Sequence, residues 1–197
     1  IIPDYDLNLM KPNQNLANLT GEVLNGVTHV LKQEEFDWVL VQGDTTTTMA
    51  GAMASFYEKV PIGHVEAGLR SFDKTMPEEV NRILTDQISD LLFTPSRDGN
   101  INLEREGIDK RKVFFVGNVM IDTLIRMLPK SKIPNIAGLS KDYVLVTLHR
   151  PSNVDHPKVL LKIINMEWAL LWIGLLQVVI YIKEEKHLVF QVKSLME

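Results

Sequence analysis

The 197-residue chain has the composition of an ordinary globular protein, with 45% hydrophobic and 23% charged residues. Its 21 basic and 25 acidic residues give a net charge of -4, so it lacks the basic excess that would attract nucleic acid or an anionic membrane surface. The absence of cysteine excludes disulfides, thiolate nucleophiles and cysteine-ligated metal centres. It is also compatible with a reducing compartment. We therefore expect a cytoplasmic protein with a small-molecule partner.

The predicted elements alternate between helices and strands from the start of the chain. Apolar residues at helical spacing predict an amphipathic helix over residues 16–31. The continuous apolar run at residues 38–42, which stops at Gly43, predicts a short buried strand. Further helices are expected at residues 45–59, 77–90, 98–106 and 119–128, and further strands at residues 60–66, 91–93 and 113–116. Right-handed crossovers between such strands imply a parallel sheet with helices on both faces, a doubly wound α/β domain.

A domain boundary is expected in the stretch 129–141, which holds two prolines, one glycine and three lysines with little periodicity. The sequence therefore predicts a first domain over residues 1–128 and the start of a second over residues 142–197. That second domain should open with a strand at residues 143–148 and a helix that begins near His156.

The two ends of the chain do not fit this regular pattern. The opening IIPDYDLNLM has no initiator methionine and no signal-type region, so we expect the chain to begin partway into a longer protein. Residues 168–182, WALLWIGLLQVVIYI, are almost wholly apolar but fall short of the roughly 20 residues that span a bilayer. They are interpreted as a buried helix or strand, or as a segment out of step with the rest of the fold.

Chemistry is expected just after the strands, because ligands of parallel α/β sheets bind beyond the carboxyl ends. Asp44 and Thr45 follow the first strand and begin a helix, where free amides suit a phosphate. The alternative is that either residue merely caps the helix. After the second strand, His64 and Glu66 share one side of the strand. The alternative there is a buried, hydrogen-bonded histidine beside an ion-paired glutamate. No metal site is expected, because His-x-Glu here lacks the cysteine partner motif of zinc deaminases.

Two further candidates stand at the start of a helix and at the end of a strand. Glu78 and Arg82 are four residues apart on the helix that begins at Pro77, although a solvated charged surface would give the same pattern. His149 and Arg150 end the first strand of the second domain, where they could hold a phosphate or an acid. The alternative is that His149 is a structural residue.

Five segments follow one another in a fixed order: VQGDTTTT, GHVEAGLRSFD, MPEEVNRILTD, FVGNVMIDTL and TLHRPSNVD. Together they closely resemble the UDP-N-acetylglucosamine 2-epimerase family of the non-hydrolysing kind. The resemblance runs from about Pro3 to about Lys162 and implies two Rossmann-like domains of the GT-B type, with the nucleotide sugar between them. The family's opening strand with its GTRPE-type loop and its later SGGxQEE-type segment have no counterpart here. The resemblance therefore implies a chain that is truncated at both ends.

The resemblance also implies an activity and roles for particular residues. The family interconverts UDP-GlcNAc and UDP-ManNAc by elimination and re-addition of UDP through 2-acetamidoglucal, without a metal or nicotinamide cofactor. It implies that the functional residues are Asp44, Glu66, Glu78 and, from the second domain, His149. Charge and location alone add Arg70 and Arg150 as candidate phosphate or substrate contacts, and Thr45, with its hydroxyl at a helix N-terminus, is a further candidate substrate contact. A homodimer is expected for the full-length protein, and the chain by itself is expected to be inactive.

Two alternatives to this function stay open at the level of the sequence. One is a hydrolysing epimerase of the same fold class, which releases free ManNAc and UDP. The other is a catalytically inactive fragment.

Overall fold

The computed structural model describes residues 2–132, 143–148, 151–163 and 177–182. The chain divides into two compact units, residues 1–131 and residues 132–197, and each is described here by itself.

The first unit is built on a parallel sheet of four strands: β1 (Val39–Gln42), β2 (Ile62–Val65), β3 (Leu91–Thr94) and β4 (Val113–Phe115). Its helices are α1 (Leu16–Leu31), α2 (Thr46–Tyr57), α3 (Pro77–Ile88), α4 (Arg97–Arg105) and α5 (Val119–Met127), with short 3-10 turns η1 (Lys110–Lys112) and η2 (Leu128–Lys130). Every predicted helix and strand of this unit is present, with ends that differ from the prediction by at most two residues. The predicted α/β fold with a parallel sheet is confirmed.

Local sequence explains where several of these helices begin. Asn15, Thr45, Ser96 and Asn118 stand at the N-caps of α1, α2, α4 and α5, and each side chain accepts a hydrogen bond from a backbone N–H of the first turn. Pro77 occupies the first turn of α3, as predicted, where its missing N–H costs nothing.

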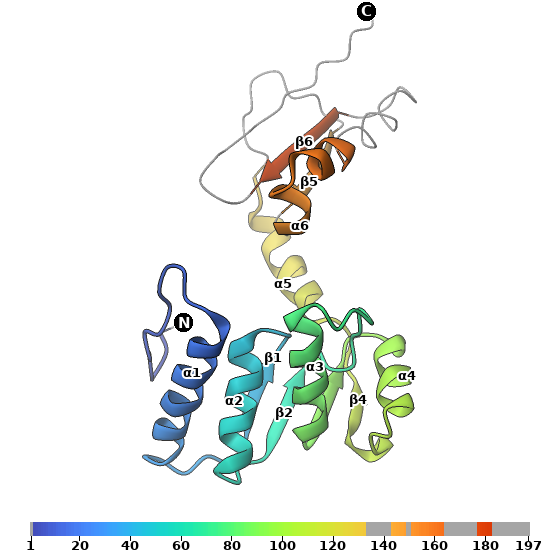
Figure 1. The fold of residues 1–197 in the computed structure, drawn as a ribbon. Helices are drawn as coiled ribbons and strands as arrows, with labels where there is room; N and C mark the ends of the chain where they lie inside the picture. The colour runs from blue at the N-terminus through green and yellow to red at the C-terminus, as the bar shows by residue number, and fades with distance from the viewer. Residues whose placement is uncertain (1, 133–142, 149–150, 164–176, 183–197) are drawn as a thin grey trace, which may run out of the picture. The chain divides into compact units, whose positions relative to one another are not determined.

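The strands follow one another across the sheet in chain order, β1-β2-β3-β4. Successive right-handed crossovers in one direction bring the connecting helices to the same face, and Figure 1 shows α1, α2 and α3 as a layer in front of the strands. On the opposite face Leu40 is 66% exposed and Phe114 is 45% exposed. The predicted helical cover on both faces is therefore wrong for the described residues of this unit, because a sheet whose order never reverses places its crossovers on one side.

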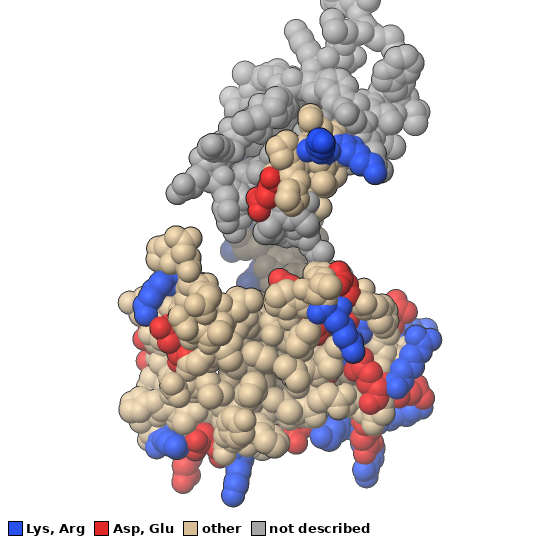
Figure 2. Space-filling model, in the orientation of Figure 1, with Lys and Arg blue, Asp and Glu red and all other residues tan. Residues whose placement is uncertain are grey.

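The core lies between the sheet and this helix layer. One cluster joins α1 to α2 through Leu19, Val23 and Ala50, and another joins β3 to α4 through Leu92 and Leu103. Helix α2 is buried along much of its length, and many of its buried residues are small, including Ala50, Gly51, Ala52, Ala54 and Ser55. In Figure 2 the surface over α2 carries no charge, and Lys, Arg, Asp and Glu gather toward the ends and over α4. The middle helix of the layer therefore packs closely against its neighbours.

The second unit contains a two-stranded parallel sheet of β5 (Tyr143–Leu148) and β6 (Gln177–Ile182). Strand β5 has its predicted bounds. Helix α6 (Pro151–Val154) and a helical stretch at residues 157–163 follow it. Strand β6 is the last part of the apolar segment 168–182, for which the sequence left open a helix or a strand. Residues 177–182 of that segment form a strand. None of the described helices combines the length and apolar character that crossing a membrane requires.

Candidate functional site

The carboxylates predicted after the first two strands lie together at one edge of the sheet. Strands β1 and β2 are paired so that Gln42 lies beside Val65, and Asp44 and Glu66 follow at the carboxyl ends. A Cβ atom added at Gly43 would lie 3.6 Å from Oε2 of Glu66. The side chain of Glu66 therefore lies over the turn that carries Asp44.

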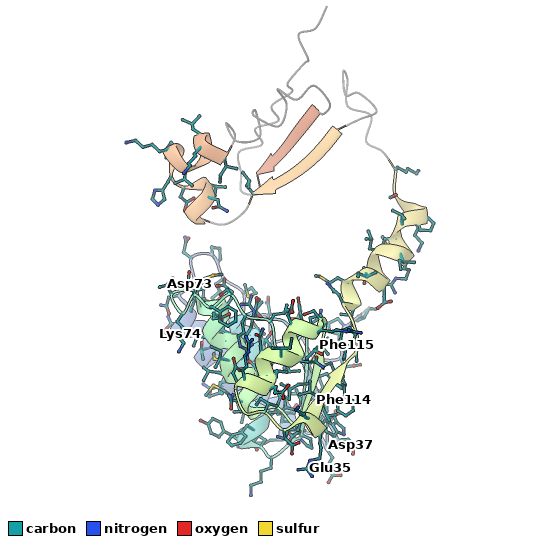
Figure 3. All side chains as sticks on the ribbon, turned by 90° about the vertical axis from the view of Figure 1, so that its right-hand side faces the viewer. Glu35, Asp37, Asp73, Lys74, Phe114 and Phe115 are labelled. Atoms are coloured by element: carbon teal, nitrogen blue, oxygen red, sulfur yellow. The ribbon has the colours of Figure 1, made fainter. Side chains whose placement is uncertain are left out.

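The end of the first unit that holds this site also holds the loop before α3. Figure 3 labels Asp73 and Lys74 of that loop at one end of the unit, and Glu35 and Asp37, which precede β1, at the other. The loop therefore lies at the edge where the strands have their carboxyl ends.

Glu66 has a left-handed backbone, with φ of 75°, which is uncommon for a residue other than glycine. The turn is held by its neighbours: the N–H groups of Glu66 and Ala67 both donate to the carbonyl oxygen of Phe93, at 3.0 and 3.1 Å, and Gly43 N–H donates to Val65 at 3.0 Å. Strained conformations of this kind persist only where the surroundings impose them, and they concentrate at functional sites. Asn8, Asn13, Lys59 and Phe72 also have a positive φ, so the backbone of Glu66 is consistent with a functional role but does not by itself identify one.

Asp44 is held by two consecutive residues of α3. Asn81 Nδ2 donates to the backbone carbonyl of Asp44 at 2.9 Å, and the Arg82 guanidinium forms an ion pair with the Asp44 carboxylate. Arg82 also donates to Glu79 Oε2 at 2.9 Å. The described partners of Arg82 are thus Asp44 and, at i,i+3 along the helix, Glu79; Glu78, four residues before Arg82, is not among them.

Glu79 is a central residue of this site that the sequence did not single out. Its side chain is buried, at 1% exposure, and it accepts hydrogen bonds from the N–H groups of Ser71 at 2.8 Å and Phe72 at 2.9 Å. Burial alone would raise the pKa of the Glu79 carboxyl, but these hydrogen bonds and that from Arg82 outweigh it and hold the pKa below its ordinary value. Glu78, one residue earlier in the first turn of α3, is exposed.

Two adjacent glutamates cannot both face inward on a helix, and the sequence does not say which one does. Glu79 forms the buried side of α3 with Asn81, Thr85 and Asp86, but helical spacing does not pick it out, because Glu78 is three, seven and eight residues from the same three side chains. Since all four are polar, a search for an apolar stripe passes over them.

Thr45 is the N-cap of α2. Its Oγ1 accepts a hydrogen bond from the N–H of Thr48 at 3.2 Å, and Thr48 Oγ1 donates to the Gln42 carbonyl at 2.6 Å. Thr45 therefore caps the helix, which is the alternative that the sequence left open. Thr45 is also exposed, at the edge of the sheet that holds Asp44.

His64 is fully buried one strand position before the end of β2. Its Nδ1 lies 2.6 Å from Asp86 Oδ1, and its Nε2 lies 2.9 Å from the Gly43 carbonyl oxygen. This is the buried, hydrogen-bonded histidine that the sequence left open as an alternative. Glu66, by contrast, has no ion pair with a described residue.

Arg70 turns into the protein. Its side chain is 1% exposed, and NH2 lies 2.7 Å from Asp86 and 2.6 Å from Glu106, while NH1 donates to the Leu69 carbonyl. Burial lowers the pKa of Arg70, but the hydrogen bonds and charges of Glu106 and Asp86 outweigh it and raise the pKa above its ordinary value. The guanidinium that was expected to contact substrate phosphate is thus engaged with two buried or half-buried carboxylates.

The second-domain candidates His149 and Arg150 lie outside the described residues. Within the described part of the chain, no three His, Asp or Glu side chains are grouped so that they could hold a metal ion.

A family model described as UDP-N-acetylglucosamine 2-epimerase matches residues 1–191. The match therefore continues beyond Lys162, where the motif resemblance ends, and includes the apolar segment 168–182. A curated relative from Methanococcus maripaludis, described as a UDP-N-acetylglucosamine 2-epimerase homolog, is 45% identical over 169 residues, which are 83% of this chain and 46% of that protein.

Solved structures of similar proteins agree in fold. The UDP-GlcNAc 2-epimerase of Methanocaldococcus jannaschii, in complex with UDP-GlcNAc and UDP, has a TM-score of 0.79 at 41% identity. The matched part is 92% of this chain and 51% of that enzyme's chain. The Neisseria meningitidis enzyme bound to UDP-GlcNAc has a TM-score of 0.81 at 38% identity. The matched part is 92% of this chain and 52% of that enzyme's chain.

These structural neighbours have the GT-B type of fold, and this chain spans about half the length of the curated relatives it matches. By sequence over nearly its whole length and by fold, the chain belongs to the UDP-N-acetylglucosamine 2-epimerase family.

Proposed function

We propose that this chain supplies the first-domain carboxylates of an enzyme that interconverts UDP-GlcNAc and UDP-ManNAc. The observation that carries the proposal is the juxtaposition of Asp44 and Glu66 at the carboxyl edge of the sheet, within the segments that resemble the family. Relatives from Methanocaldococcus jannaschii and Neisseria meningitidis bind UDP-GlcNAc, which supports a nucleotide sugar as the substrate here.

The proposed reaction explains why carboxylates are needed. The hydrogen at C2 of the sugar lies next to no carbonyl that could stabilise a carbanion, so its removal must accompany cleavage of the C1–O bond to UDP. The products are UDP and 2-acetamidoglucal, and UDP adds back after a proton returns to the other face of C2. Positioned carboxylates supply the base, the acid and the stabilisation of positive charge that develops on the sugar.

Asp44, Glu66 and Glu78 are the proposed catalytic acids and bases, and His149 of the second domain is proposed to assist the leaving diphosphate. Arg150 and the hydroxyl of Thr45 are proposed substrate contacts. The reaction requires neither a metal ion nor a nicotinamide. For Arg70 the inward ion pairs with Asp86 and Glu106 favour a role in shaping the turn after β2 instead of a substrate contact.

The test is a fusion enzyme, because relatives with bound substrate are about twice as long as this chain. Residues 1–131 of this chain, which form one compact unit, would replace the matching segment of the Methanocaldococcus jannaschii enzyme. Turnover of UDP-GlcNAc in deuterated water is expected to place deuterium at C2 of UDP-ManNAc, because the proton leaves and returns through groups that exchange with solvent.

The same experiment separates the alternatives. Free ManNAc and UDP as end products would identify a hydrolysing epimerase. Epimerised product without deuterium would indicate an oxidation and reduction at the sugar, which contradicts the proposed mechanism.

A further inference from the structure

The fully buried His64 makes a contact with the site that the proposed reaction does not use. Its Nε2 lies 2.9 Å from the carbonyl oxygen of Gly43, the residue directly before Asp44. A carbonyl oxygen only accepts, so Nε2 carries a hydrogen and donates it. The ring of His64 therefore fixes the turn after β1 from beneath the site.

The opposite nitrogen of the ring joins His64 to the turn after β2. Nδ1 lies 2.6 Å from Asp86 Oδ1, and the other carboxylate oxygen, Oδ2, accepts the N–H of Gly68 at 3.1 Å. Gly68 is two residues beyond Glu66. One chain of hydrogen bonds thus runs from Gly43 through His64 and Asp86 to Gly68, and it links the turns that carry the two carboxylates.

The far end of this chain is anchored by charge. Asp86 Oδ2 also pairs with Arg70 at 2.7 Å, and Arg70 pairs in turn with Glu106, the C-cap residue of α4. Asp86, His64 and the Arg70 side chain are at most 1% exposed. Buried polar networks in which every member is paired hold one geometry, because an unpaired member would be costly. The described buried side-chain polar atoms all have a partner.

We infer that His64 is a positioning residue for the epimerase reaction, which holds the Gly43 carbonyl so that Asp44 and Glu66 keep their relative placement. The inference rests on the proposed function for the roles of those two carboxylates. The coupling is short: the Gly43 carbonyl is one peptide from Asp44, and a Cβ at Gly43 would lie 3.6 Å from the Glu66 carboxylate. A displacement of this turn therefore moves Asp44 and the surface on which Glu66 rests.

Two substitutions separate this role from a general contribution to stability. In His64→Gln the side-chain amide nitrogen occupies nearly the place of Nε2 and can still donate to Gly43. In His64→Asn it occupies nearly the place of Nδ1 and can still donate to Asp86, but the link to Gly43 is lost. Ser55→Ala is the control, because Ser55 is fully buried and its hydroxyl donates to Gly51 at 2.8 Å inside α2, away from the site.

The experiment is NMR spectroscopy on the full 197-residue chain. In the wild type the Nε2 resonance of His64 should be that of a protonated, pyrrole-like nitrogen. In His64→Asn the carbon resonances of the Gly43 carbonyl and the Glu66 carboxylate should both move, and Gly43 N–H should exchange at least about fivefold faster, because a lost buried hydrogen bond is worth roughly 1 kcal/mol or more. In His64→Gln and Ser55→Ala these signals should stay near their wild-type values.

Activity in the fusion enzyme gives a second measurement. His64→Asn should lower kcat by roughly tenfold to a hundredfold with little change in KM, as expected for misplaced catalytic groups, and His64→Gln should recover most of the loss. The inference is overturned if the wild-type Nε2 carries no hydrogen, or if both His64 variants perturb Glu66 equally. A fusion enzyme that fails to turn over UDP-GlcNAc would contradict the proposed function alone, since the NMR signals would still decide the positioning role.

Discussion

At the scale of one residue, Glu66 combines a left-handed backbone with a proposed catalytic role. A left-handed backbone costs a residue with a Cβ roughly 1 to 2 kcal/mol, a cost that glycine avoids. Gly43, Gly68, Gly107 and Gly117 all occupy this region with φ near 80°, whereas at position 66 the chain has a glutamate. The carboxylate at this position is therefore present despite its conformational cost.

A first prediction follows from that cost. Glu66→Gly should raise the free energy of unfolding by up to about 1 kcal/mol, because it relieves the strained backbone while adding some freedom to the unfolded chain. In the fusion enzyme the same change should abolish epimerisation, and Glu66→Gln, which keeps the strain, should slow it at least about a hundredfold. Urea unfolding and turnover of UDP-GlcNAc check the two parts. A Glu66→Gly enzyme that retained its rate would remove Glu66 from the site.

Glu79 gives a second prediction, which concerns pH. Its pKa is lower in the folded protein than the roughly 4.3 of an unfolded chain. A carboxyl whose pKa is lowered on folding stabilises the folded protein at pH values above its pKa in the unfolded chain. This stabilisation is lost as the pH falls from the unfolded-state pKa through the folded-state pKa. Part of the decline in the free energy of unfolding below about pH 4.3 should therefore disappear in Glu79→Gln.

The measurement is urea unfolding between neutral pH and the acid range. Glu79→Gln should be less stable than the wild type at pH 7, because an amide cannot accept the same hydrogen bonds, and its curve should decline less steeply in acid. Ser55→Ala, which removes a buried hydrogen bond without a titrating group, should keep the acid slope of the wild type. An unchanged slope in Glu79→Gln would show that Glu79 does not contribute to acid unfolding.

Helix α3 is the element that organises the site. It buries polar residues, Glu79, Asn81, Thr85 and Asp86, while its apolar Val80 and Leu84 are 39% and 44% exposed. The usual arrangement of an amphipathic helix is thus reversed in the described structure. The polar side chains reach the turns after β1 and β2 through Asp44, His64 and Gly68. Departures of this kind from local sequence rules are expected at functional sites.

The approach of α4 to the turn after β2 gives a third prediction. Gly68 has φ of 79°, and a Cβ atom there would lie 2.5 Å from the carbonyl oxygen of Gly99 in the first turn of α4. Because both the backbone conformation and the contact with another backbone exclude a methyl group, Gly68→Ala should lower the free energy of unfolding by about 2 kcal/mol or more. Gly107→Ala is the matched control: its φ is 80°, but its added Cβ would meet no atom within 4 Å. Urea unfolding of both variants should show the larger loss at Gly68.

At the scale of the whole molecule, we propose that the described site is one side of a larger one. This chain spans about half the length of relatives that bind UDP-GlcNAc, and the second-domain candidates His149 and Arg150 lie outside the described residues. Precise positioning of a substrate can account for roughly 7 to 11 kcal/mol of barrier lowering, so we expect one wall of a site to be insufficient for turnover.

A fourth prediction is that residues 1–197 alone do not epimerise UDP-GlcNAc at an enzymatic rate. Binding of UDP to the isolated chain should be no tighter than about millimolar, a level that corresponds to roughly 4 kcal/mol. Calorimetry with UDP and a product assay with UDP-GlcNAc measure the two quantities. A monodisperse preparation with ordinary epimerase activity would show that the remaining half of the relatives is dispensable.

The fifth prediction concerns the proposed boundary at residues 129–141. A segment with Pro129, Pro134 and three lysines between two units should be cleaved early by trypsin, because linkers make few stabilising contacts. Mass spectrometry should then find a stable fragment that ends at Lys130, Lys132 or Lys141. Early cleavage inside the sheet of residues 39–115 would place the boundary elsewhere.

The sequence by itself determined the elements of the first unit, because hydrophobic periodicity, helix caps and glycine stops are local signals that act within a few residues. It also brought Asp44 and Glu66 to one edge, since parallel strands share the direction of their carboxyl ends. It did not determine which glutamate of α3 faces inward, nor that Arg70 turns toward Asp86 and Glu106. Those choices depend on partners that are up to 38 residues apart along the chain, as in the Arg82–Asp44 pair.

Only the tertiary structure decided the polar interior of α3 and the open face of the sheet. An apolar stripe predicts a buried face when burial is driven by the removal of apolar area from water. In α3 the gain comes instead from hydrogen bonds and ion pairs that satisfy buried polar groups, and these require a geometry that no local pattern encodes. The order of strands across the sheet is likewise a property of the assembled chain, and it is this order that places α1, α2 and α3 on one face and leaves Leu40 and Phe114 exposed on the other.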